Sequence, residues 1–147
     1  MSNINPIYRN PVRHPEDTGV SIIGREVTFS TPAPNGLIAI GAFEKNSVVL
    51  RAGVTIVTAF NAGTTNVLQV GTDTTAEAYI TAANSAAGTA GNNKQGTGVN
   101  IGAPLATDTI LYARFTQTGT AATAGRAIIW VEAFVPRTED PRTRAAI

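Results

Sequence analysis

The chain has 147 residues, of which 43% are hydrophobic and 14% charged, and its formal net charge is +1. This length fits one domain with a single core, and the absence of cysteine excludes disulfides and thiolate metal sites. No apolar run reaches the ~18 residues of a membrane-spanning helix, and residues 1–17 lack the apolar core of a signal peptide. We therefore expect synthesis in a reducing cytoplasm and no membrane partner.

Charge and proline are concentrated at the two ends of the chain. Residues 1–18 and 136–147 hold 9 of the 21 charged side chains and 5 of the 8 prolines. Proline blocks helix and removes a hydrogen-bond donor from a sheet. The sequence predicts an extended N-terminal arm (1–18), a folded domain (19–135) and an extended C-terminal arm (136–147). Unstructured termini are the alternative.

Between the arms, apolar and β-branched runs are separated by turn residues. They predict strands at residues 19–30, 36–43, 47–60, 66–71, 108–118 and 125–135. In the first run the change of apolar phase predicts a β-bulge at Gly24. The third run is expected to be two strands divided near Arg51–Gly53. Residues 52–73, two apolar runs joined by a small polar turn, predict a β-hairpin.

The centre of the chain is rich in small and β-branched residues. Residues 52–125 contain 16 Ala, 16 Thr and 10 Gly, a composition that suits tightly packed strands and disfavours long helices. Residues 75–83 fit either one or two helical turns or a short strand, and the stretch that follows, to residue 100, is predicted to be a surface loop. About eight strands at this spacing predict an all-β, jelly-roll-like β-sandwich.

The last two predicted strands each have one apolar face and one mixed face. In 125–135 the apolar face is Ala127, Ile129, Val131, Ala133 and Val135, and the mixed face is Arg126, Ile128, Trp130, Glu132 and Phe134. In 108–118 the corresponding sets are Leu111, Ala113 and Phe115 against Ile110, Tyr112 and Arg114. Because Trp, Tyr and Arg are enriched at interface hot spots, we predict a protein interface at Tyr112, Arg114, Trp130 and Phe134. The alternative is that both faces are core and the charges reach solvent at the strand ends.

The sequence points away from catalysis. His14 is the only histidine and lies in the N-terminal arm, so neither a zinc site nor a Ser-His-Asp triad is expected. Asp73 and Glu77 lack an accompanying aromatic cluster, so we interpret them as solvated surface acids, not as the carboxylate pair of a glycosidase. Residues 91–98 (GNNKQGTG) depart from the Gly-Lys-Ser/Thr order of a phosphate-binding loop. Basic residues are dispersed among acids, so we expect no nucleic-acid partner, no cofactor and no enzymatic activity.

Two segments carry a family resemblance: residues 52–73 (AGVTIVTAFNAGTTNVLQVGTD) and residues 106–135 (ATDTILYARFTQTGTAATAGRAIIWVEAFV). They resemble small virion proteins of tailed bacteriophages, which pair a hairpin of the pattern AFNAGTTN-LxVGT with a later hairpin of the pattern Y-A-x-F/Y-T-x-T-G-x-A-x-A-G-x-A. The resemblance covers about residues 36–135 and leaves both arms outside. Such proteins are typically capsid decoration (cement) proteins with a jelly-roll fold that sit as oligomers on the outer surface of the head.

The resemblance implies a structural virion protein that is made in the host cytoplasm, binds the major capsid protein and stabilises the head by bridging capsomers. It implies a homo-oligomer, with a trimer expected first and a dimer next, and it makes the predicted interface an oligomer or capsid contact. The arms are expected to grip neighbouring proteins through Arg9, Arg13, Arg142 and Arg144. Related sandwiches also serve as head-fibre bases and tail parts, so a receptor- or glycan-binding module of such an appendage is the alternative.

Overall fold

This computed structural model describes residues 19–136, which contain seven β-strands and two short helical segments joined by turns and loops. In chain order they are β1 (Val20–Thr28), the 3₁₀ turn η1 (Pro34–Gly36), β2 (Ile38–Phe43), β3 (Val48–Thr58), β4 (Thr65–Gly71), α3 (Ala82–Ser85), β5 (Gly91–Gln95), β6 (Thr109–Thr118) and β7 (Arg126–Phe134). The prediction of an all-β sandwich is confirmed, with seven strands in this part of the chain where about eight were expected.

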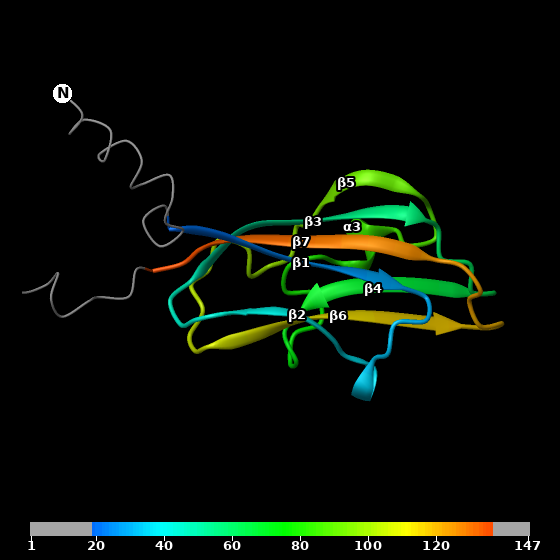
Figure 1. Cartoon of the computed structure of the whole chain (residues 1–147), viewed down its shortest axis with the longest axis horizontal. Coiled ribbons are helices and arrows are strands. Elements are labelled where there is room, and N and C mark those ends of the chain that lie inside the picture. The colour runs from blue at the N-terminus through cyan, green and yellow to red at the C-terminus, as the bar shows by residue number, and fades with distance from the viewer. Residues whose placement is uncertain (1–18, 137–147) are drawn as a thin grey trace, which may run out of the picture.

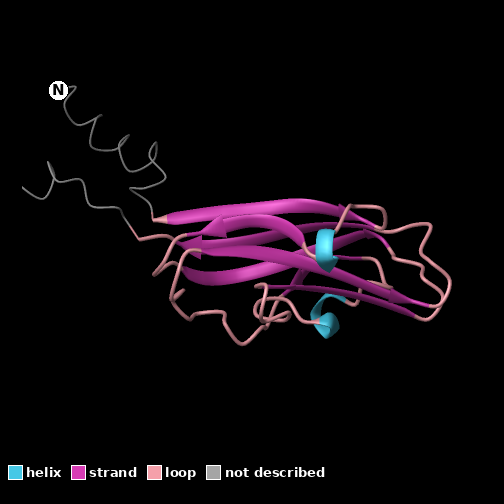
Figure 2. Cartoon of the chain, turned by 90° about the horizontal axis from the view of Figure 1, so that it is seen from below, coloured by secondary structure: helices cyan, strands magenta, loops and turns pink. Residues whose placement is uncertain are grey.

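The strands form two antiparallel sheets that pack face to face (Figure 1). Sheet A has the strand order β1-β7-β3-β5 and sheet B the order β2-β6-β4. Sheet A is the upper layer in Figure 1 and sheet B the lower, and Figure 2 shows the strands running along the long axis of the molecule. Strands that follow one another along the described chain always lie in opposite sheets of the sandwich.

This alternation contradicts the predicted hairpin over residues 52–73, because β3 lies in sheet A and β4 in sheet B. The connection between them contains Phe60, which is buried and whose N–H donates to the carbonyl oxygen of Ala87 at 2.9 Å. The Phe60 ring also packs against Phe115, with ring centroids 4.5 Å apart. A buried aromatic at this point holds the chain between the sheets, so it crosses the sandwich and does not fold back. The later pair, β6 and β7, is divided between the sheets in the same way.

Two local predictions on the edge and centre of sheet A are also wrong. β1 pairs with β7 without a register shift, so Gly24 is not a bulge. The apolar side chains of β1 instead occupy both faces, with Ile22 outside and Val27 in the core. β3 is one strand, not two, and its register with β7 shifts between Val49 and Arg51 and again between Ile56 and Thr58. Pairing with β7 on both sides of each shift keeps the strand continuous.

Large aliphatic side chains and alanines from the inner faces of both sheets form the core. β7 contributes the predicted apolar set, of which Ala127, Ile129, Val131 and Ala133 are fully buried. The other central strands contribute Val49, Ala52, Val54 and Ile56 from β3, Leu68 and Val70 from β4, and Leu111 and Ala113 from β6. This alternation of large and small side chains lets the two sheets interdigitate, which explains why the sequence is rich in alanine.

The free edge of β4 is covered by a single bridge where an eighth strand would lie. Val70 and Ile80 exchange backbone hydrogen bonds of 3.0 Å, and Ala78, Tyr79 and Ile80 are buried. The region predicted as either helix or strand therefore contains both this bridge and, immediately after it, α3. The predicted surface loop up to residue 100 contains β5, which pairs with β3 and forms one edge of sheet A.

Candidate interaction surfaces

The outward side of sheet A, which we call the A face, exposes large apolar groups from two neighbouring strands. Ile22 of β1 is 62% exposed and Phe134 of β7 is 48% exposed, while Val20 and Ile128 are 39% and 41% exposed. Val20 lies opposite Phe134 in the β1–β7 register, so their side chains are cross-strand neighbours. Val20, Ile22 and Phe134 thus form one apolar group on the solvent side of the sheet, whereas Ile128 lies opposite Glu26, on the far side of Trp130.

Trp130 lies at the centre of the A face and is held flat by its neighbours. Trp130 pairs with Gly53 of β3, and the indole lies where a side chain at Gly53 would be. The guanidinium of Arg51 sits over the indole, 5.6 Å from the ring centroid. Arg51 also forms a bidentate ion pair with Glu132, with Nε–Oε1 at 3.0 Å and Nη2–Oε2 at 3.3 Å. The hydrogen bond to Glu132 raises the pKa of Arg51.

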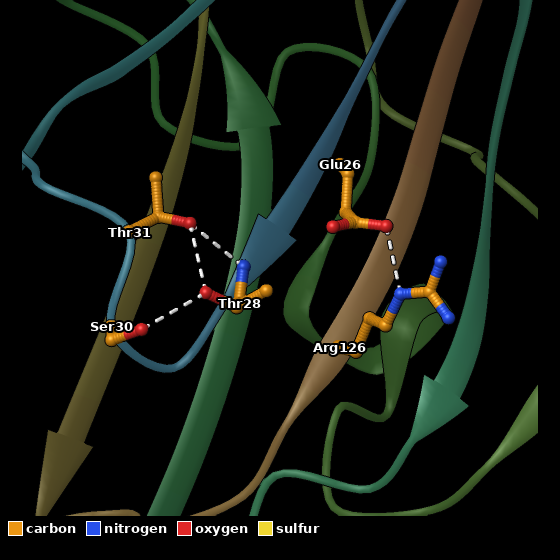
Figure 3. A network of polar contacts seen from close by, with 5 residues as sticks. All are labelled: Glu26, Thr28, Ser30, Thr31 and Arg126. Atoms are coloured by element: carbon orange, nitrogen blue, oxygen red, sulfur yellow. Dashed lines mark hydrogen bonds and ion pairs between the residues drawn. The ribbon is translucent and has the colours of Figure 1, made fainter.

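The far end of the A face carries a second ion pair and a cluster of hydroxyl groups (Figure 3). Nε of Arg126 on β7 donates to Oε2 of Glu26 on β1 at 2.7 Å. Beside it, the hydroxyl of Thr28 lies within hydrogen-bond distance of the hydroxyls of Ser30 and Thr31. The backbone N–H of Thr28 donates to the Thr31 hydroxyl at 2.8 Å, which ends β1 in a turn. Both ion pairs of the A face therefore join neighbouring strands of one sheet.

The outward side of sheet B, the B face, has a different character. Tyr112 and Arg114 of β6 are half-buried there, and Ile110 is 49% exposed. Nη2 of Arg114 donates to the backbone carbonyl oxygen of Asp73 at 2.7 Å, so this guanidinium braces the loop after β4.

Glu77 anchors the same loop through its carboxylate. Its Oε1 accepts a hydrogen bond from Nε2 of Gln69 at 2.9 Å and another from the backbone N–H of Ala82 at 2.8 Å. The hydrogen bond from Ala82, followed by that from Gln69, lowers the pKa of Glu77. Glu77 is half-buried at the surface, and its carboxylate has a structural role that the sequence did not predict, because it joins the start of α3 to β4. Asp73 is exposed, as expected for a surface acid.

The glycines of residues 91–98 allow backbone segments to pack closely. A Cβ at Gly96 or Gly98 would collide with the carbonyl oxygen of Tyr79 or Ala78. Lys94 is used internally: its Nζ donates to three backbone carbonyl oxygens in and after α3, those of Thr89 at 2.6 Å, Ser85 at 2.8 Å and Ala86 at 3.3 Å. Desolvation lowers the pKa of Lys94. This ammonium thus has the partners that a bound phosphate would otherwise supply.

The structure separates the residues predicted to form one interface. Trp130 and Phe134 lie on the A face, whereas Tyr112 and Arg114 lie on the B face, on the opposite side of the sandwich. The arm residues Arg9, Arg13, Arg142 and Arg144, and also His14, lie outside the described residues. The sequence reasoning missed Val20 and Ile22 as surface residues. Only their pairing with β7, more than 100 positions away, places them beside Phe134 and Glu132.

Neither a metal cluster nor a membrane helix is found in the described part of the chain. Among residues 19–136, no three His, Cys, Asp or Glu side chains gather as metal ligands. Within the same range, no helix has the length and apolar content needed to cross a membrane.

Strand order defines the described domain as an antiparallel β-sandwich with two outer faces. A solved structure described as "Cyanophage Pam1 capsid asymmetric unit" contains a chain with a similar fold. The TM-score is 0.62 at 15% sequence identity, and the match covers 80% of this chain and 85% of that chain. At this identity the likeness concerns the fold. The sequence matches no protein-family model and no curated protein.

Proposed function

We propose that this protein is a structural virion protein, a decoration or cement protein that binds the outer surface of a phage capsid. The observation that carries the proposal is the fold likeness to a chain of a phage capsid assembly over 80% of this chain. The segments 52–73 and 106–135, which resemble decoration proteins in sequence, contain most of β3, β4, β6 and β7. Three of these strands, β3, β6 and β7, are the central strands of the two sheets. The resemblance and the fold likeness therefore concern the same part of the molecule.

The proposed mechanism is mechanical bridging of capsomers and needs no reactive group. The close-packed core makes the sandwich stiff, and its two outer faces lie on opposite sides of a thin body. A stiff body with two contact surfaces can join two neighbours without deforming. Its effect on the capsid comes from many weak contacts repeated over the particle, since linked sites gain strength by effective concentration.

We further propose that both arms contribute to capsid attachment. The described chain begins and ends at the same end of sheet A, where the N–H of Val135 donates to the carbonyl oxygen of Gly19 at 2.6 Å. Residues 1–18 and 137–147 are thus attached to neighbouring points. Each exposed arginine–carboxylate pair is worth only about 0.2–1 kcal/mol, so attachment through Arg9, Arg13, Arg142 and Arg144 requires repetition and weakens with salt.

Copy number in purified virions tests this function. A cement protein is present in numbers comparable with the major capsid protein, whereas a receptor- or glycan-binding module of a fibre or tail is present in few copies. Quantitative mass spectrometry of the particles separates the two roles, and absence from the particles overturns both. Deleting residues 1–18, and separately 136–147, then tests the arms. Unchanged occupancy and salt response on undecorated heads would assign attachment to the sandwich alone.

A further inference from the structure

Among residues 19–136, the A face is an exposed sheet surface of a size that matters for association. The nine-residue strands β1 and β7 and the facing part of β3 span about 450 Å² in projection at ordinary strand spacing and rise. This area includes the exposed apolar side chains of the A face and also its two ion pairs. Monomeric proteins rarely expose contiguous apolar patches larger than a few hundred Å², and the largest patch on a protein surface is often functional. Two such faces in contact bury on the order of 1,000 Å², which is the lower limit for a specific interface.

The A face is also flat, because its two large aromatic rings lie against glycines. A Cβ at Gly53 would be 2.6 Å from Cε2 of Trp130, and a Cβ at Gly19 would be 2.6 Å from Cε2 of Phe134. Both rings therefore occupy space that side chains at these glycines would fill, and they lie along the sheet. A flat apolar sheet surface suits packing against another sheet, as in the interior of a sandwich.

The charges of the A face favour a second copy of this chain as the occupant. Across a two-fold axis each residue near the axis meets residues of the same face, so an unpaired charge would be repelled by its own copy. Here both cations have a partner within the sheet: Arg51 pairs with Glu132 and Arg126 with Glu26. Each arginine of the A face is thus already neutralised by a glutamate of the same sheet. Two copies of this face can therefore pack together without placing unpaired like charges opposite each other.

We propose that the A face is a self-association surface, on which the A face of a second copy packs about a two-fold axis with Trp130 at the centre. The occupant is a second copy of this chain. This favours the dimer over the trimer that the resemblance implied. The inference concerns the free protein, so it stands or falls independently of capsid binding.

The test compares the full chain with two matched lysine variants. Ile22→Lys places a cation on the A face, and Ile110→Lys places the same group at a similarly exposed position on the B face. Sedimentation velocity over nanomolar to high micromolar concentration gives the association state, and circular dichroism checks the fold. Trp130 is the only tryptophan, so its emission and its quenching by acrylamide report directly on the A face.

We expect dimers of the wild type and of Ile110→Lys, with Trp130 becoming shielded from acrylamide as the concentration rises. Ile22→Lys should raise the dissociation constant on the order of 100-fold, because it buries an unpaired charge. Equal association of all three proteins would place the contact elsewhere and overturn the proposal. Monomers at every concentration would also overturn it, and Trp130 that becomes accessible only after removal of residues 1–18 or 137–147 would identify that segment as the cover.

Discussion

Gly53→Ala offers a direct test of how Trp130 is held on the A face. The backbone of Gly53 is not in the left-handed region, so alanine fits its conformation. The new Cβ would nevertheless lie 2.6 Å from Cε2 of Trp130. An ordinary carbon–carbon contact is about 3.5 Å, so the indole must move outward by roughly 1 Å, away from the sheet and from Arg51.

The expected cost follows from what this movement disrupts. The cation–π contact with Arg51 is worth about 0.5–1 kcal/mol at an exposed site, and overpacking costs typically ~1–3 kcal/mol. Replacing glycine by alanine also stabilises the folded state by about 0.4–1 kcal/mol, because alanine lowers the conformational entropy of the unfolded chain. Because Trp130 can move into solvent, we expect the low end of the overpacking range. The free energy of unfolding should therefore fall by about 1 kcal/mol.

A double-mutant cycle makes the reasoning testable. Guanidinium unfolding is followed by far-ultraviolet circular dichroism at a concentration that favours the monomer, since Trp130→Ala removes the only tryptophan. In the Trp130→Ala background, Gly53→Ala should become neutral or stabilising, because the ring it displaces is gone. Gly88→Ala is the control, since nothing lies closer than 4.0 Å to its Cβ. An equal loss from Gly53→Ala in both backgrounds would refute the account.

Three further outcomes are expected. Because the pKa of Glu77 is lowered in the folded protein, its ionised form stabilises the fold above the ordinary glutamate pKa of about 4.3, and this contribution is lost as the pH falls through the lowered value. Glu77→Gln keeps an acceptor oxygen, so urea unfolding between about pH 6 and pH 3 should show a shallower loss of stability on acidification than the wild type. Ile129→Ala should cost about 2–5 kcal/mol in chemical unfolding, whereas Ile22→Ala at low protein concentration should cost under ~1 kcal/mol, and similar losses would contradict their assignment to opposite faces. A double-mutant cycle on Glu26 and Arg126 should give a coupling of about 0.2–1 kcal/mol that shrinks in high salt, and a coupling that ignores salt would show that the pair is not solvent-exposed.

Strand positions were predictable where a strict two-residue period records burial directly. β7 is the clearest case, because Ala127 through Ala133 alternate between the core and the A face. Of the predicted apolar set, the members within β7 are fully buried and Val135, just after the strand, is half-buried. β5 was not predictable, because its sequence GNNKQ lacks β-branched and aromatic residues. It becomes a strand through pairing with β3 at the sheet edge and through the ammonium of Lys94, which binds the carbonyls around α3.

Pairing between strands was the part that local pattern could not supply. The sequence identified Trp130 and Tyr112 as surface aromatics, but their division between opposite faces depends on which sheet each strand joins. That choice is made by the connections, such as the one in which Phe60 turns into the core. The exposed row of Val20 and Ile22 was missed for the same reason, since alternation within β1 does not say which of its faces meets the opposite sheet.

The strand order has a consequence for synthesis on the ribosome. β6 is the central strand of sheet B and β7 lies between β1 and β3 in sheet A, yet these are the last two strands of the described domain to be made. The first four strands have no ladder hydrogen bonds with one another, because every one of them pairs with β5, β6 or β7. At ~5–20 residues per second, β1 emerges several seconds before its partner. The first strands must therefore remain unpaired over that interval. The many Ala, Thr and Gly residues of residues 52–125 reduce the risk of aggregation during that time, because they expose less apolar surface than larger side chains would.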